Sequence, residues 1–152
     1  MKYFKFIIPV LLFLLSCNSI LKKEVGRLKI NKLSTESNLV IEQTELNLKK
    51  DDDIKVWSDI DIEYEGDVTL MFRIEILKDD ENLGVLEVDP MEKSVTIGEL
   101  KTSIMGKTNW SFTGKNSNIT IEEDGIYTFR GLLVSSENPS LTITKAEIVL
   151  KK

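Results

Sequence analysis

Two runs of alternating side chains, IKVWSDIDIEY at residues 54–64 and VTLMFRIEI at residues 68–76, decide the fold class of this chain. In both runs an apolar side chain recurs at nearly every second position, and Ser58 is the main exception. Successive side chains of a strand point to opposite faces, so this period indicates half-buried antiparallel strands. The intervening Glu65-Gly66-Asp67 suits a three-residue turn, because glycine readily adopts the left-handed backbone conformation. The two runs therefore predict a β-hairpin.

The same alternation continues from Leu39 to Leu150, and clusters of Asp, Asn, Gly and Pro interrupt it about every 8–15 residues. We find no helical period longer than about two turns in this part of the chain. Roughly eight to ten short strands separated by turn signals are typical of a sandwich or barrel. The sequence therefore predicts an all-β fold, an antiparallel β-sandwich over residues 38–152, with jelly-roll or immunoglobulin-like connectivity.

Asp124-Gly125-Ile126-Tyr127-Thr128-Phe129 resembles the D-x-G-x-Y entry to the penultimate strand of immunoglobulin-like domains, which also occurs in carbohydrate-binding jelly rolls. The resemblance implies that Gly125 allows a corner and that Tyr127 buries its ring while its hydroxyl bonds to the backbone across the turn. It also places Phe129 in the core. The motif supports a sandwich and implies no particular function.

The N-terminus carries a secretory signal. Lys2 and Lys5 precede the apolar run Phe6–Leu15, and Ser16 and Cys17 follow it. The apolar run of about ten residues is shorter than the roughly 20 that a transmembrane helix needs. Leu14-Leu15-Ser16-Cys17 resembles the lipobox of bacterial lipoproteins, and the resemblance implies cleavage before Cys17 and acylation of its sulfur and amino group. A transmembrane anchor, or a cleaved signal without lipid, are the alternatives.

These features divide the chain into a lipoprotein signal peptide at residues 1–16, a lipidated cysteine and tether at residues 17–37, and the sandwich. Within the tether, Leu28-Lys29-Ile30 is a candidate edge strand. Asn18 rather than an aspartate follows the cysteine, so the resemblance favours the outer membrane, with the domain facing either the periplasm or the cell surface. The membrane is thus the first expected partner, reached through the N-terminal lipid.

The amino-acid composition limits which catalytic and metal sites the chain can form. The chain contains no histidine, and Cys17 is its single cysteine. Acylation would remove that thiol, which excludes Ser-His-Asp and Cys-His catalysis and most zinc, copper and iron sites. Removing Lys2 and Lys5 with the signal leaves 18 basic and 25 acidic side chains, a net charge of −7. This charge opposes nucleic-acid binding. We expect no enzymatic activity, no cofactor and no metal site.

Trp57, Asp59, Asp61 and Arg73 form the candidate binding face. The odd-numbered side chains of residues 54–64 point away from the core face, and the predicted hairpin places Arg73 opposite Trp57. An aromatic ring beside carboxylates can stack a sugar. Alternatively, a bulge near Ser58 turns the ring inward, another segment covers it, or Arg73 forms a cation–π pair with it.

Other candidates have simpler explanations. Trp110 and Phe112 are two residues apart on a predicted strand and so point to the same face. Core packing is therefore expected for both. The acidic clusters at residues 51–53, 79–81 and 122–124 suit turns, and their spacing matches no EF-hand calcium loop. The resulting hypothesis is a non-catalytic lipid-anchored envelope protein, most simply a protein-interaction or structural accessory subunit that binds another envelope protein. The alternative is a glycan- or calcium-binding module.

Overall fold

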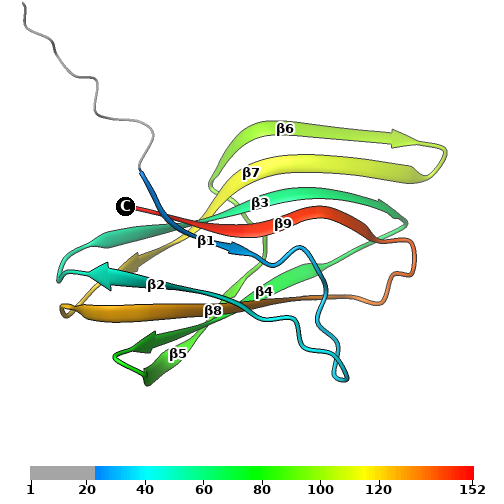
Figure 1. The fold of residues 1–152 in the computed structure, drawn as a ribbon. Helices are drawn as coiled ribbons and strands as arrows, with labels where there is room; N and C mark the ends of the chain where they lie inside the picture. Colours follow the sequence, from blue (N-terminus) through cyan, green and yellow to red (C-terminus); the bar gives the residue numbers. More distant parts are fainter. Residues whose placement is uncertain (1–22) are drawn as a thin grey trace, which may run out of the picture.

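The computed structural model describes residues 23–152, and the predicted signal peptide and Cys17 lie outside the described residues. The described chain consists of nine strands and no helix, which confirms the predicted all-β class (Figure 1). No helix of the described part is long and apolar enough to cross a membrane. The strands are β1 (Glu24–Lys29), β2 (Glu42–Leu48), β3 (Asp53–Glu65), β4 (Leu70–Lys78), β5 (Glu81–Val88), β6 (Val95–Ile104), β7 (Lys107–Thr120), β8 (Gly125–Ser135) and β9 (Thr142–Lys151).

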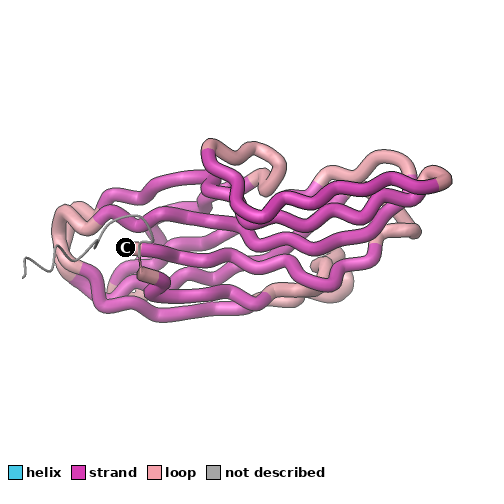
Figure 2. The backbone as a smooth tube through the Cα atoms, turned by 90° about the horizontal axis from the view of Figure 1, so that it is seen from above, coloured by secondary structure: helices cyan, strands magenta, loops and turns pink. Residues whose placement is uncertain are grey.

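The strands form two antiparallel sheets that pack face to face without closing into a barrel. One sheet has the order β1-β9-β3-β7-β6 and the other β2-β8-β4-β5. Seen from above, the strands run along the length of the molecule and the loops gather mainly at its ends (Figure 2). The alternating apolar side chains meet between the sheets, which confirms the predicted sandwich. The largest fully buried side chains include Phe72, Phe129, Ile54, Ile60, Ile62, Leu70, Ile74, Leu133, Ile148 and Leu150.

The predicted hairpin between residues 54–64 and 68–76 is wrong. β3 pairs with β7 and β9, whereas β4 pairs with β5 and β8 in the opposite sheet. Alternation shows that each strand has one buried face, and it cannot distinguish two neighbours in one sheet from two strands facing each other across a core. The connection after Glu65 crosses between the sheets instead of reversing within one. The side chain of Asn138 holds this crossing, since its amide donates to the carbonyls of Glu65 and Asp67 at 2.9 Å each.

Strand β1 corrects the expected domain boundary. It pairs with β9 at the edge of the five-stranded sheet, and Leu28 and Ile30 are buried in the core. Gly131 on β8 makes room for them, because a Cβ there would lie 2.9 Å from Cδ1 of Leu28. The sandwich therefore includes residues assigned above to the tether, and the candidate edge strand at Leu28–Ile30 is present. Only two alternating apolar positions signalled it in the sequence.

The corner before β8 matches its sequence motif. Tyr127 and Phe129 are buried, as predicted, and the Tyr127 hydroxyl donates to the carbonyl of Glu123 at 2.8 Å. Phe112 is also buried, and Trp110 packs against the core while remaining partly exposed. The Trp110 indole N–H donates to Glu99 at 2.8 Å, so its polar edge lies at the rim of the sandwich.

Candidate functional site

The predicted binding residues of β3 lie on the outer face of the five-stranded sheet. In the register with β9, Trp57 lies opposite Val149, Asp59 opposite Glu147 and Asp61 opposite Lys145. The even-numbered residues of β3 face the other sheet, so parity assigned the faces of this strand correctly. The polar residues of the outer face come from β1, β3, β7 and β9, four strands that are adjacent in the sheet.

Trp57 is not an open platform, which corrects the prediction. Its side chain is only 9% exposed, and the Lys151 ammonium lies 4.3 Å from its ring centroid. A bulge interrupts the β3–β7 register between Val56 and Trp57, at the place where an irregularity was considered. The ring nevertheless remains outside the main core, beside the buried Val149. The Lys151 side chain of the same sheet lies over it, and its indole N–H has no hydrogen-bond partner among residues 23–152.

Arg73 lies elsewhere, so the four predicted residues do not form one site. It belongs to β4 in the other sheet, where its guanidinium pairs with Glu87 of β5 at 3.2 Å. Both side chains are more than half exposed, at 55% and 57%. Arg73 also lines a shallow hollow of about 210 Å³ on the outer face of that sheet, together with Ile41, Glu75 and Val85. The hairpin prediction had placed Arg73 beside Trp57, and the error follows directly from it.

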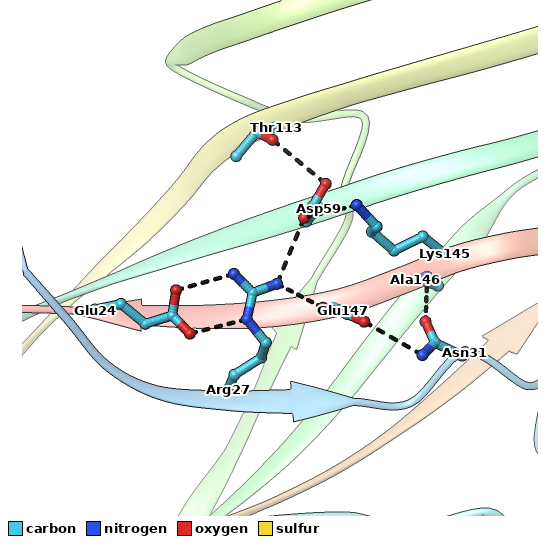
Figure 3. A network of polar contacts seen from close by, with 8 residues as sticks. All are labelled: Glu24, Arg27, Asn31, Asp59, Thr113, Lys145, Ala146 and Glu147. Carbon is cyan, nitrogen blue, oxygen red and sulfur yellow. Dashed lines mark hydrogen bonds and ion pairs between the residues drawn. The ribbon is translucent and has the colours of Figure 1, made fainter. Parts of the chain in front are cut away.

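Arg27 organises the polar side chains of the outer face (Figure 3). Its guanidinium makes two 2.9 Å hydrogen bonds to Glu24, a 2.5 Å hydrogen bond to Glu147 and a 3.4 Å contact to Asp59. It therefore joins the edge strand β1 to both β9 and β3. Glu147 also accepts a hydrogen bond from the Asn31 amide at 3.3 Å, and Asn31 in turn accepts one from the backbone N–H of residue 146.

Electrostatics explain why the cation lies there. Asp59 and Glu147 are directly opposite each other on neighbouring strands, an arrangement in which like charges repel. Arg27 lies between them, and Lys145 approaches Asp59 at 3.4 Å. The hydrogen bond from Arg27 lowers the pKa of Glu24 below its usual value of 4.5, and the same hydrogen bond raises the pKa of Arg27. We call Glu24, Arg27, Asp59, Lys145 and Glu147 the Arg27 network.

The Arg27 network satisfies its own charges within the sheet. Each carboxylate of the network contacts a cation, and Asp59 also accepts from the Thr113 hydroxyl at 3.4 Å. The arrangement can hold β1 in place, and each of its carboxylates is already paired with a cation. Within residues 23–152, no group of three or more acidic side chains is arranged to hold a metal ion.

Two other regions have exposed side chains or strand edges without a neighbour in the described part of the chain. The first is strand β6, an edge strand whose ten residues are all exposed. The second is a cleft of about 500 Å³ between β5 and the C-terminal part of β7, lined by aliphatic side chains and rimmed by carboxylates. Sequence reasoning identified neither, because both are properties of how the strands are ordered. Arg27 and Glu147 were also missed, although the odd parity of Glu147 beside Ala146 and Ile148 indicates a side chain outside the core.

No known protein-family model matches this chain, and no curated protein matches it.

Proposed function

We propose that this chain is a non-catalytic lipoprotein of the bacterial outer membrane, anchored through Cys17, whose sandwich binds another envelope protein through strand β6. The lipobox-like sequence supports the anchor, because the only cysteine of the chain occupies the position that lipidation requires. The exposed edge of β6 supports the binding role, and it is the observation that carries the proposal. An edge strand presents unpaired backbone groups to which another chain can add.

The aliphatic side chains of β6 share one face. Val95, Ile97, Leu100 and Ile104 pair with residues of β7 whose side chains lie on the outer face of the sheet. Their exposed fractions range from 46% to 71%. Exposed apolar side chains gathered along one strand are typical of a protein-interaction surface. We call these four residues the β6 stripe.

The position of the β6 stripe suits a protein tethered by its N-terminus. Glu24, Lys151 and Lys55 are aligned at one end of the five-stranded sheet, where the described chain begins. The turn at Met105 and Gly106 joins β6 to β7 at the opposite end, next to Glu65 (Figure 1). Lys55 and Glu65 are ten residues apart along β3, or about 33 Å at roughly 3.3 Å per residue. A lipid at Cys17 would therefore leave the hairpin tip, with its fully exposed Met105, directed away from the membrane.

Part of β6 is protected against indiscriminate pairing. The register shifts between Ile97 and Leu100, and Gly98 has a φ of 62°. Bulges of this kind twist an edge and limit pairing with unrelated strands. The straight segment from Leu100 to Ile104 remains, and it leads directly into the exposed turn. We therefore assign the main contact to this segment.

Site-specific photocrosslinking in intact cells tests the binding role. A photoreactive residue at Ile104 should crosslink to one discrete envelope protein, and Leu100→Lys in the same chain should abolish that product. Ile126 is the matched control, since it is a half-exposed isoleucine on β8 in the other sheet. If Ile104 and Ile126 give the same products, or if Leu100→Lys changes nothing, β6 is not the docking surface.

Detergent phase partitioning tests the anchor independently. The wild-type chain should enter the detergent phase and Cys17→Ser should not, because two acyl signals anchor stably where a single chain is marginal. Equal partitioning of both forms would remove the lipid from the proposal and leave the role of β6 untouched.

A further inference from the structure

A cleft lies between β5 and the C-terminal part of β7, and its lining includes no residue of the β6 stripe. It has a volume of about 500 Å³ and opens between the edges of the two sheets. Pockets of this size with an apolar lining and a few polar groups are typical of ligand sites. Its apolar lining consists of Ile76, Leu83, Val85, Leu86, Ile119, Ile121 and the ring of Tyr127.

Both walls of the cleft end in strand edges without a neighbour. β5 pairs only with β4, so its other edge is free. β6 pairs with β7 only as far as Lys115, and the β7 residues beyond it have a strand on one side only. The Asn116 amide marks the point of departure, because it donates to the carbonyls of Asp89 at 3.1 Å and Glu92 at 2.9 Å in the β5–β6 connection. An added strand can therefore continue the sheet where β6 leaves it.

The rim of the cleft is acidic. Glu81, Glu122 and Glu123 line it together with a single cation, Lys78. That cation is already engaged, since its ammonium lies 3.2 Å from both Glu123 and Asp79. Within the described part of the chain, Glu81 and Glu122 form no ion pair. The mouth therefore repels a carboxylate or phosphate headgroup and attracts a cation.

We propose that this cleft binds an extended, basic segment of another polypeptide, whose aliphatic side chains alternate with Lys or Arg. The segment adds to the free edge of β7 through backbone hydrogen bonds. Every second side chain then enters the cleft toward Ile119 and Ile121, and the intervening side chains lie near Glu81 and Glu122. The site lies outside the β6 stripe, so it goes beyond the proposed function and is tested separately from it.

Fluorescence polarisation with defined peptides tests the charge preference, using the full mature chain in detergent. The probe is a fluorescein-labelled KVKVKVK peptide, and EVEVEVE is its acidic counterpart. The basic peptide should bind at least about tenfold more tightly. The double variant Glu81→Lys with Glu122→Lys should lose that advantage. The control, Glu36→Lys with Glu137→Lys, changes the net charge equally at exposed positions outside the cleft and should retain it.

Backbone methylation tests the strand. One version of KVKVKVK is N-methylated at the valines and another at the lysines, because alternate N–H groups of a strand point to opposite edges. Pairing with β7 predicts that one version loses about tenfold or more in affinity and that the other binds as before. Equal weakening by both pairs of lysine substitutions would mean nonspecific attraction, and equal binding of both methylated peptides would exclude strand addition. Either result overturns the proposal, and far-UV circular dichroism confirms that each variant is folded.

Discussion

Replacing Arg27 by methionine is expected to lower the free energy of unfolding by about 2 kcal/mol. The guanidinium is 26% exposed, and its partners Asp59 and Glu147 are 20% and 10% exposed. Removing one member of a buried ion pair costs about 3–5 kcal/mol, whereas exposed pairs contribute about 0–1 kcal/mol, and this network lies between the two. Methionine keeps an apolar stem at the position opposite Val149, so the loss reports mainly on charge.

The physical reason is the pair of facing carboxylates. Without Arg27, Asp59 and Glu147 repel each other, and only Lys145 remains beside Asp59. Adding Glu147→Gln to the Arg27→Met chain should therefore recover about 1 kcal/mol, because it removes one of the two charges. The same Glu147→Gln change alone should destabilise the protein, because it weakens the pair with Arg27. Glu147→Gln should thus raise the free energy of unfolding in the Arg27→Met chain and lower it in the wild-type chain, as expected if Arg27 offsets the repulsion between the two carboxylates.

Urea denaturation of the soluble chain, followed by circular dichroism, measures these differences. Arg73→Met is the matched control, since it removes an arginine that pairs with one glutamate at a more exposed position. Its loss should stay below about 0.5 kcal/mol. If Arg27→Met costs no more than Arg73→Met, or if Glu147→Gln brings no recovery, the carboxylates do not need the cation between them.

Three further outcomes are expected. Urea melts should show Phe129→Ala costing about 3–5 kcal/mol and Trp57→Ala about 2 kcal/mol, since Trp57 is covered only by neighbouring side chains; equal losses would place Trp57 in the core. Chelator and reductant should leave the melting temperature unchanged, and a fall on adding EDTA would reveal a bound cation. Stability should be level between about pH 5 and 9, because the chain has no histidine. Below that range it should fall as Glu24, whose folded pKa is lowered, takes up a proton, and in strong alkali it should fall as Lys78 loses one, since Glu123 raises its folded pKa. A change in the melting temperature as the pH passes through about 6.5 would contradict this expectation.

Fold class was readable from the sequence because a period of two needs only a local pattern. Strands such as β3 and β4 bury one set of alternate side chains, and this pattern exists before any partner is known. Which strands pair with each other depends on packing between residues that are far apart in the sequence. β3 and β4 look like hairpin neighbours in the sequence, yet they lie in opposite sheets and contribute to the same core. The sequence contains little indication of β1, because only Leu28 and Ile30 show the alternating apolar pattern there. No sequence pattern predicts the space that Gly131 leaves for them.

The candidate site was predictable only where a single strand decides it. Parity placed Asp59 and Asp61 outside the core, but it could not show that β1 would bring Arg27 against Asp59. Nor could it show that flanking side chains would cover Trp57. Polar residues on a sheet face are thus ambiguous until their neighbours are known, because the same charges serve either to bind a ligand or to hold an edge strand.

The completed structure resolves this ambiguity by showing which groups have partners. Around Arg27 every carboxylate contacts a cation, and the binding of a ligand would first have to break those contacts. The β6 stripe and the acid-rimmed cleft have the opposite property. The β6 stripe, and Leu83 and Val85 of the cleft, are open to solvent, and the strand edges beside them have no neighbour within the described chain. The proposed binding of a second polypeptide at these two places therefore requires none of the sandwich's own interactions to be broken.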